Sequence, residues 1–130
     1  MNLPPLPKQH KKKEADFGLV FREWIEGHPD LLDSSSIELK HTRGRPTFNL
    51  KEWKKNQRIF AYRIRSEKGC LIRVEGLNGE PDYNWYRNAP AYLAIKYPKG
   101  FVVIDTAMIP DQKSLTYAQA CAIAHRIVHV

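Results

Sequence analysis

The sequence predicts an α/β protein with a central mixed β-sheet flanked by helices. Apolar residues recur at helical spacing from Glu14 onward, an alternating segment follows at 37–42, and a second amphipathic helix precedes several short strand-like segments. The order helix, strand, helix, strand is typical of a sheet that packs against helices. Since 130 residues suffice for one hydrophobic core, we expect a single domain over 14–130.

The first 13 residues have a different composition. The segment MNLPPLPKQHKKK combines three prolines with a basic cluster and has no apolar period. This pattern favours a flexible arm over 1–13. Two interpretations are open for Lys11, Lys12 and Lys13, which either contact phosphates or belong to a solvated, unstructured tail.

The first helix and the first strand each follow a clear pattern. A helical stripe of Phe17, Phe21 and Trp24 ends near Gly27, which predicts one amphipathic helix. The segment IELKHT at 37–42 then alternates in the manner of a strand. Its two faces differ, because side chains of a strand alternate between faces and Glu38 shares its face with Lys40.

The second helix is predicted to start at Asn49, with Glu52 three residues on as in a capping box. Trp53 and Ile64 lie on its apolar stripe, and Gln57 falls inside the same stripe. This glutamine is either a satisfied core amide or a group that faces the same cleft as the strand residues.

The remainder predicts strands, turns and one last helix. We expect strands over 70–74 and 83–86, a hairpin of 91–97 with 101–106, and a helix over 114–128. Thr116 and Gln119 are in capping-box positions for that helix.

Composition narrows the classes of partner. Lys and Arg number 21 against 14 acids, a net charge of +7 that favours a polyanion. There is no apolar run that could span a bilayer and no apolar segment of a signal peptide after the basic start, so we expect no membrane and a cytoplasmic protein. The two cysteines and five histidines have no zinc-ligand spacing.

The most informative local feature is Glu38-Leu39-Lys40, since its carboxylate and ammonium project side by side from one face of a strand. Glu38 could bind a hard cation. Lys40 could orient the attacking water or stabilise the charge that develops on the scissile phosphate. The same spacing also occurs on exposed faces of edge strands without any chemistry.

Longer stretches carry a resemblance. EADFGLVFREW, IELKHTRG, FNLKEWKKNQ, GCLIRVEGLNGEPDYNWYRNAPAYLAIKYP and SLTYAQACAIA together resemble small phage Holliday-junction resolvase-like nucleases of the PD-(D/E)xK superfamily. The resemblance implies a restriction-endonuclease-like core, Mg²⁺ with Mn²⁺ as a substitute, and a homodimer that cuts branched double-stranded DNA symmetrically. It also implies a role in phage recombination or DNA processing, in the cytoplasm of the host cell.

The resemblance assigns roles to particular residues. Glu38 and Lys40 match the E-x-K pair, Gln57 matches the glutamine of the following helix, and Glu14 looks like the metal-binding acid of the first helix.

The aspartate that usually precedes E-x-K has no counterpart on a strand here. Two candidates for the missing metal ligand stay open, Asp33 in the preceding turn and Asp82 at the start of a later strand. Asp82 could instead simply belong to a Pro-Asp turn. Without either aspartate, a catalytically inactive nuclease fold that binds DNA or another protein is the alternative.

Further basic residues are candidates for phosphate contacts, which position DNA without reading its sequence. Besides the arm, they are Arg43 and Arg45 in a loop and Lys51, Lys54 and Lys55 on the second helix. On the other interpretation each is a solvated charge cluster. RNA binding is a third, weaker interpretation of the same charge.

Aromatic residues concentrate in the later strands. Tyr83, Trp85, Tyr86, Tyr92 and Tyr97 are either core residues or exposed rings that stack on bases or form a dimer patch. Because strand side chains alternate, Tyr83 and Trp85 share one face and Tyr86 lies on the other.

Overall fold

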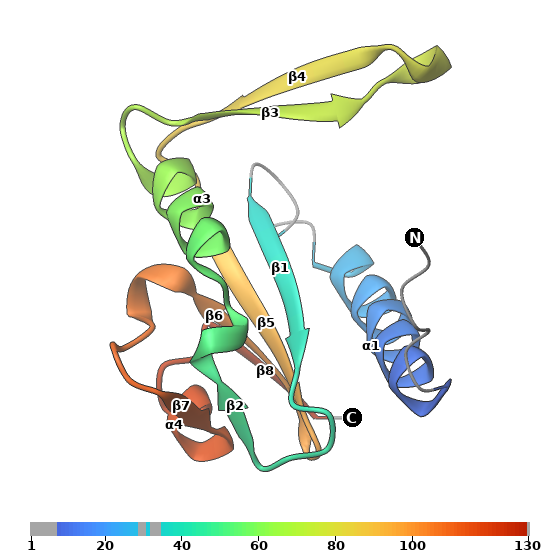
Figure 1. Ribbon diagram of the computed structural model, residues 1–130, viewed down its shortest axis with the longest axis vertical. Helices are drawn as coiled ribbons and strands as arrows, with labels where there is room; N and C mark the ends of the chain where they lie inside the picture. Colours follow the sequence, from blue (N-terminus) through green and yellow to red (C-terminus); the bar gives the residue numbers. More distant parts are fainter. Residues whose placement is uncertain (1–7, 29–30, 32–34, 130) are drawn as a thin grey trace, which may run out of the picture.

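The computed structural model of the protein describes the backbone of residues 8–28, 31 and 35–129, and the side chains of 17–28, 31, 35–73, 76 and 78–129. Helices cover both faces of a central sheet in these residues (Figure 1). The predicted α/β class with a mixed sheet is therefore confirmed.

The central sheet has four strands in the order β1-β5-β6-β8. β1 is parallel to β5, while β5 with β6 and β6 with β8 are antiparallel. The strands are β1 (Ser36–His41), β5 (Ala91–Tyr97), β6 (Gly100–Asp105) and β8 (Arg126–His129). The predicted strand at 37–42 and the predicted hairpin are confirmed, and β1 lies at the edge of the sheet.

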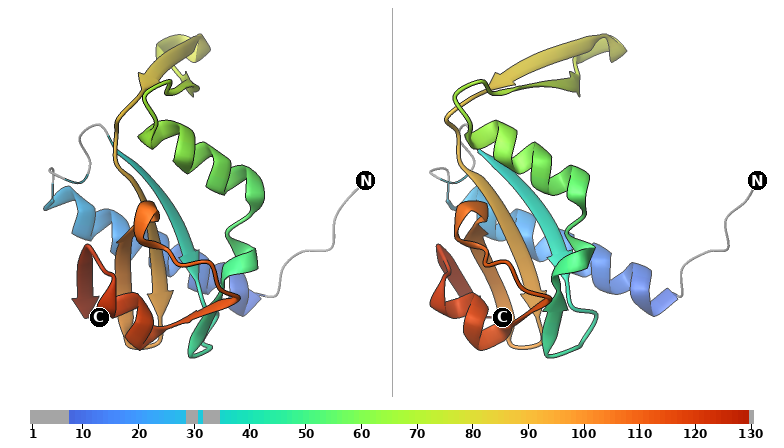
Figure 2. Two further views of the ribbon diagram at one scale, coloured as in Figure 1. Left: turned by 90° about the vertical axis from the view of Figure 1, so that its left-hand side faces the viewer. Right: turned by 60° about the vertical axis from the view of Figure 1, so that its left-hand side comes forward.

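Helix α1 (Lys8–Glu26) packs on one face of this sheet (Figure 2). Its buried stripe of Phe17, Phe21 and Ile25 contacts Phe101 and other residues of β5 and β6. The helix begins at Lys8 rather than at Glu14, so residues 8–13 are not the flexible arm that we predicted. Lysine and glutamine are good helix formers, and a helix needs no apolar stripe in a turn that extends beyond the core. Residues 1–7 lie outside the described residues.

The opposite face of the sheet is covered by α3 (Lys55–Arg65) and by the chain around β2 (Thr47–Asn49) and β7 (Ser114–Thr116). β2 and β7 form a short antiparallel pair. Side chains from these segments build the larger core cluster: Phe48, Leu50, Trp53, Ala61, Ile64, Leu93, Ile95, Tyr97, Val102, Ile104 and Leu115. The protein therefore has helix, sheet and helix layers.

Two predicted helices are wrong in extent. The helix expected from Asn49 is divided: Asn49 caps a 3-10 turn, η1 (Leu50–Glu52), and α3 starts separately at Lys55. The helix expected over 114–128 is only α4 (Tyr117–Ala122), between β7 and β8. The Thr116–Gln119 capping box is confirmed. Pairing with β2 and β6 overrides local helix preference at both ends of α4.

A separate hairpin projects from the C-terminal end of α3 (Figure 1). It consists of β3 (Cys70–Glu75) and β4 (Pro81–Tyr86), joined by η2 (Leu77–Gly79). Both of its strands were predicted. They form a sheet of their own, so they extend the molecule without widening the central sheet.

Candidate functional site

The candidate site is centred on the edge strand β1. Glu38 pairs in register with Leu93, and Lys40 pairs with Ile95. Both partners belong to the core cluster beneath α3, and paired residues of a sheet point to the same face. Glu38 and Lys40 therefore face the side of the sheet on which α3 packs.

Gln57 of α3 meets these two residues. Its Nε2 donates a hydrogen bond to Glu38 Oε1 at 3.0 Å, and Lys40 Nζ lies 3.7 Å from the same oxygen. The Lys40 side chain is 20% exposed and that of Glu38 is 45% exposed. The structure thus brings together the three residues that we predicted as catalytic, and Gln57 faces the strand rather than the core.

The start of α3 is fixed so that Gln57 points at β1. Gln57 Oε1 accepts a hydrogen bond from the backbone N–H of Lys54 at 3.0 Å, which caps the helix. Arg58 holds the preceding turn, because its guanidinium donates to the carbonyls of Trp53 at 2.9 Å and Leu50 at 2.6 Å. One amide side chain therefore links the helix cap to the Glu38 carboxylate.

The outer edge of β1 is unpaired in the described sheet. The N–H groups of Ser36 and Thr42 bond to carbonyls at the two ends of β5. Alternate residues of a strand direct their backbone groups to opposite edges. The backbone groups of Glu38 and Lys40 thus face β5, and the carbonyl of Leu39 faces the open edge of the sheet.

Two hollows flank the Glu38–Lys40 pair. One, of about 350 Å³, is lined by Glu38 with Gln57 and Phe60. The other, of about 370 Å³, is lined by Lys40, Arg43, Glu52 and Lys54. The position of Glu52 in the same hollow as Lys40 was not predicted. Its spacing from Asn49 suggested a helix cap and did not indicate that this segment lies close to β1.

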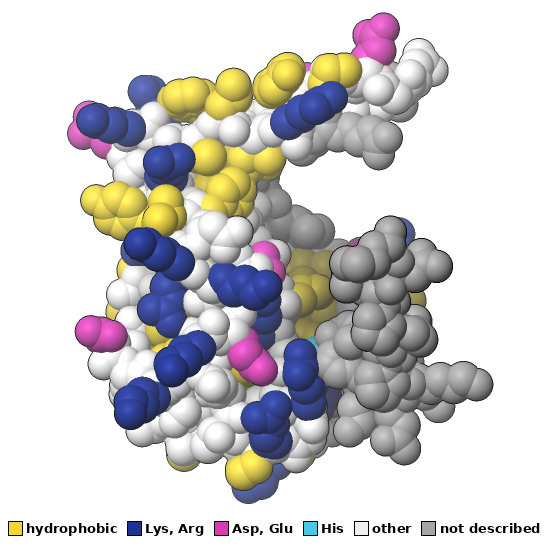
Figure 3. Space-filling view, viewed as in Figure 1, with side chains coloured by type: hydrophobic (Ala, Val, Ile, Leu, Met, Phe, Trp, Pro, Cys, Tyr) yellow, Lys and Arg dark blue, Asp and Glu magenta, His cyan; other side chains and the backbone are white. Residues whose placement is uncertain are grey.

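Arg43 and Lys54 line this second hollow together with Lys40. Arg43, Arg45, Lys51, Lys54 and Lys55, all predicted as phosphate contacts, are exposed, and cations dominate this side of the molecule in Figure 3. Arg43 and Gly44 have positive φ angles of 59° and 82°, which form the tight turn after β1. The side chains of Lys11, Lys12 and Lys13 lie outside the described residues.

The predicted metal ligands other than Glu38 are not assembled in the described residues. Asp33 lies outside them, as does the side chain of Glu14. The backbone of Glu14 is one helical turn from Phe17, which lines the hollow beside Lys40. Glu14 is thus on the opposite side of the sheet from Glu38 but near the open edge of β1.

Asp82 lies elsewhere. It is on β4, in register with Val74 of the projecting hairpin, and its Oδ1 accepts a hydrogen bond from the N–H of Tyr83. The structure therefore does not bring the candidate ligand Asp82 to Glu38, because in the described sheets β4 pairs with β3 and is not part of the central sheet. In the part of the chain whose side chains are described, no three His, Cys, Asp or Glu residues are grouped to hold a metal ion.

No known protein family, curated protein or solved structure matches this chain. Within the described residues, every helix is too short or too polar to cross a membrane.

Proposed function

We propose that the protein is a metal-dependent endonuclease that hydrolyses phosphodiester bonds in branched DNA. The observation that supports this most is the cluster of Glu38, Lys40 and Gln57 at the open edge of the sheet, next to a hollow with a basic rim. The cluster combines an acid, a cation and an oriented amide within reach of a phosphate.

The residues at this edge fit a magnesium ion in their chemistry. Mg²⁺ prefers oxygen ligands and usually takes one or two carboxylates together with water and substrate phosphates. Glu38 supplies a carboxylate whose Oε1 bonds to Gln57, and Leu39 supplies a backbone carbonyl at the same edge. Glu14 and Asp33 remain the candidates for a second carboxylate. Mg²⁺, or Mn²⁺ in its place, would lower the pKa of a bound water, so that the water could release a proton to solvent and supply hydroxide as the nucleophile.

The protein residues have separate tasks in this scheme. Gln57 holds the Glu38 carboxylate in place, and the Lys40 ammonium offsets the negative charge that grows on the phosphate as the water oxygen bonds to phosphorus. The bond from phosphorus to the leaving oxygen then breaks. Arg43 and Lys54 lie where they could contact the flanking phosphates, and such contacts add affinity for any sequence.

The resemblance to Holliday-junction resolvase-like nucleases supports branched DNA as the substrate and a homodimer as the active form. Two copies related by a twofold axis would place two sites on two strands. Branched DNA of this kind arises during recombination. The proposed site of action is the cytoplasm, which would be that of the host cell if a phage encodes the protein.

One observation favours a second function. Among the described residues, Glu38 is the one carboxylate in contact with Lys40 and Gln57, so a metal ion would need a further carboxylate from Glu14 or Asp33. A catalytically inactive nuclease fold that binds DNA without cutting it, or that binds another protein, would need no second metal ligand.

Cleavage of a labelled four-way junction, compared with linear duplex in Mg²⁺ and in EDTA, separates the two functions. We expect metal-dependent cutting of the junction, abolished in Glu38→Gln and retained in Glu23→Gln, an exposed acid of α1 on the other side of the sheet. Tight binding without cutting by the wild-type protein would refute the endonuclease and favour the binding module.

A further inference from the structure

The β3–β4 hairpin has one face that no other described element covers. Leu71 is directly opposite Trp85, and Arg73 is directly opposite Tyr83. Opposite residues of an antiparallel pair share a face, so these four side chains form one surface, which we call the outer face. Trp85 is 59% exposed, Leu71 55% and Tyr83 54%.

The other face of the hairpin already serves for packing. Cys70, Ile72 and Tyr86 contact the main core cluster. The backbone N–H groups of Asn88 and Ala89 bond to carbonyls at the end of α3. The base of the hairpin is therefore anchored, and the exposed rings of the outer face are presented on a fixed support.

We propose that the outer face binds single-stranded nucleic acid by stacking of unpaired bases on Trp85 and Tyr83. Two residues apart on a strand, the rings are separated by about 7 Å, so each can take one base of an extended strand. Aromatic rings bind bases of any sequence, and a neighbouring arginine adds cation–π and phosphate contacts. Arg73 occupies that position, opposite Tyr83.

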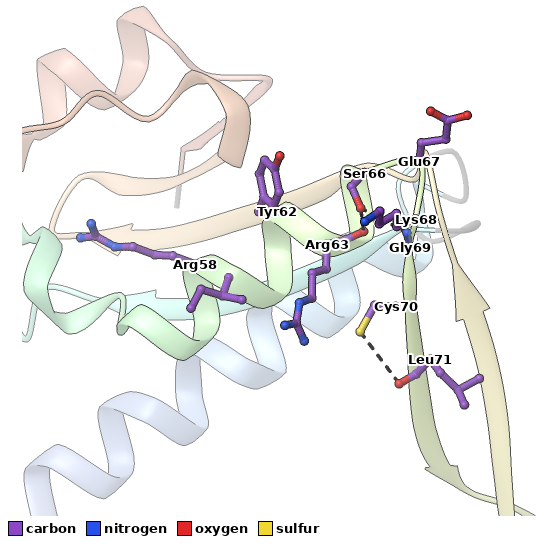
Figure 4. A pocket seen from close by; sticks show the side chains of 10 residues that line it. Arg58, Tyr62, Arg63, Ser66, Glu67, Lys68, Gly69, Cys70 and Leu71 are labelled. Atoms are coloured by element: carbon purple, nitrogen blue, oxygen red, sulfur yellow. Dashed lines mark hydrogen bonds between the residues drawn. The ribbon is translucent and has the colours of Figure 1, made fainter.

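Charge at the base of the hairpin is suitable for the sugar-phosphate backbone. A hollow of about 930 Å³ lies between α3 and β3, and it is lined by Arg63 and Lys68 against one acid, Glu67. Arg58 also lines it, but its guanidinium is bonded to the carbonyls of Trp53 and Leu50. Figure 4 shows Arg63 on the same side of α3 as Cys70 and Leu71, and Tyr62 lines the hollow as well. Cations thus lie beside the exposed rings, as a bound strand requires.

The size of the outer face favours this ligand over a second copy of the chain. Three side chains that are little more than half exposed supply at most a few hundred Å² of apolar surface. A stable protein interface takes roughly 800 Å² from each partner. Arg73 also lies on the outer face, opposite Tyr83, and charged residues are depleted from the core of a protein interface.

The position of the hairpin links it to the candidate site. Gln57 is in the first turn of α3, and the hairpin follows its last turn. The eleven residues of α3 span about 16 Å. A branched substrate could therefore place a phosphate at Glu38 and unpaired bases on the outer face. This link rests on the proposed function, but base stacking itself does not.

Tryptophan fluorescence during titration with a short oligothymidylate in EDTA tests the proposal. Trp85 is the most exposed of the three tryptophans, so we expect quenching on binding. Trp85→Phe should still bind but lose most of the quenching. Trp85→Ala and Tyr83→Ala should each weaken binding by about 5- to 140-fold, the range measured for loss of one stacked base.

Met108→Ala is the control, since Met108 is 56% exposed and lies neither on the hairpin nor among the residues that line the hollow between α3 and β3, so the substitution should be neutral. Melting curves show that each variant is folded. Unchanged binding in folded Trp85→Ala and Tyr83→Ala would overturn the proposal. So would sedimentation showing that Trp85→Ala dissociates a dimer while its binding of oligothymidylate is unaffected.

Failure of this proposal is separable from failure of the proposed function. Glu38→Gln should bind oligothymidylate as the wild type does, whether or not the protein cuts DNA. Junction cutting together with normal oligothymidylate binding by Trp85→Ala would refute stacking alone. Stacking without any metal-dependent cutting would refute the endonuclease alone.

Discussion

Replacing Gln57 with glutamate would test the geometry of the candidate site directly. Gln57 has two partners: its Oε1 accepts from the Lys54 N–H, and its Nε2 donates to Glu38 Oε1, both at 3.0 Å. The introduced carboxylate would keep the acceptor that caps α3. It would replace the donor to Glu38 with a second negatively charged oxygen.

The cost can be worked out from these contacts. Two unit charges 4 Å apart repel by about 1 kcal/mol in water and by about 4 kcal/mol at a typical protein surface. Because the Glu38 side chain is 45% exposed, we take the lower half of this range. Loss of a hydrogen bond to a charged group adds about 1.5 kcal/mol. We expect Gln57→Glu to lower the free energy of unfolding by about 2.5–4 kcal/mol at neutral pH in EDTA.

Urea unfolding measures this change, and two conditions should reverse it. At about pH 4 one carboxyl of the pair can take up a proton, which removes the repulsion. Mg²⁺ at ten times its dissociation constant should restore about 1.4 kcal/mol if the two carboxylates bind it. The matched control is Gln119→Glu, whose parent Oε1 caps α4 through the Thr116 N–H at 2.9 Å without a facing acid. It should be neutral or slightly stabilising.

Equal stability of Gln57→Glu and the wild type in EDTA at pH 7 would show that Gln57 does not contact Glu38 in solution. A loss of stability that neither acid nor Mg²⁺ reverses would show that the effect comes from packing and has no electrostatic origin.

Three further substitutions test the site and the core. Lys40→Ala should reduce junction cutting by at least about 100-fold, the usual effect of removing a group that stabilises a transition state, with binding changed less than about threefold in a gel-shift assay. Phe101→Ala should destabilise the fold by about 3–5 kcal/mol in urea, since this buried ring lies 5.5 Å from that of Phe17 and 5.8 Å from that of Phe21. Tyr97→Phe should cost about 1 kcal/mol at pH 7, because the Tyr97 hydroxyl donates to the Leu115 carbonyl at 2.8 Å.

Tyr97→Phe has a second consequence at high pH. Burial raises the pKa of the Tyr97 phenol well above its ordinary range. Its stabilising contribution is therefore complete below about pH 10, where the unfolded phenol begins to ionise, and it declines as the pH rises toward the folded pKa. Urea unfolding between neutral pH and pH 11 should show a smaller loss of stability for Tyr97→Phe than for the exposed control Tyr62→Phe.

Each of these expectations has a contrary result. Equal loss of cutting and binding in Lys40→Ala would make the lysine a phosphate contact only. A cost below about 1 kcal/mol for Phe101→Ala would mean that α1 does not pack on the sheet. The same slope against pH in Tyr97→Phe and Tyr62→Phe would place the Tyr97 phenol in contact with solvent.

Local patterns predicted the elements whose structure depends on neighbouring residues. The period of Phe17 and Phe21 identified α1, and alternation identified β1, because one buried face imposes that period on a segment. β5 and β6, which are buried along both faces, were predicted as a hairpin. Capping patterns predicted the starts of helices less accurately. Thr116 with Gln119 caps α4, whereas Asn49 caps a 3-10 turn and Gln57 caps α3.

The candidate site was partly predictable for the same reason. Spacing alone placed Glu38 and Lys40 on one face of a strand, and the apolar stripe of the second helix placed Gln57 on the side that faces the sheet. Glu52 was missed, and Asp82 was assigned to the wrong place. Both errors concern segments that are distant in sequence, which no local period can position.

The sequence by itself determined the α/β class, the basic charge and the pairing of Glu38 with Lys40 on one strand, since these depend on composition and on backbone periods. Tertiary structure decided that β1 is an edge strand, that Gln57 bonds to Glu38, and that β3 and β4 form a sheet separate from the central one. The physical reason is that strand pairing and helix docking depend on contacts between distant segments. The energies of such contacts are settled only when the whole core is packed.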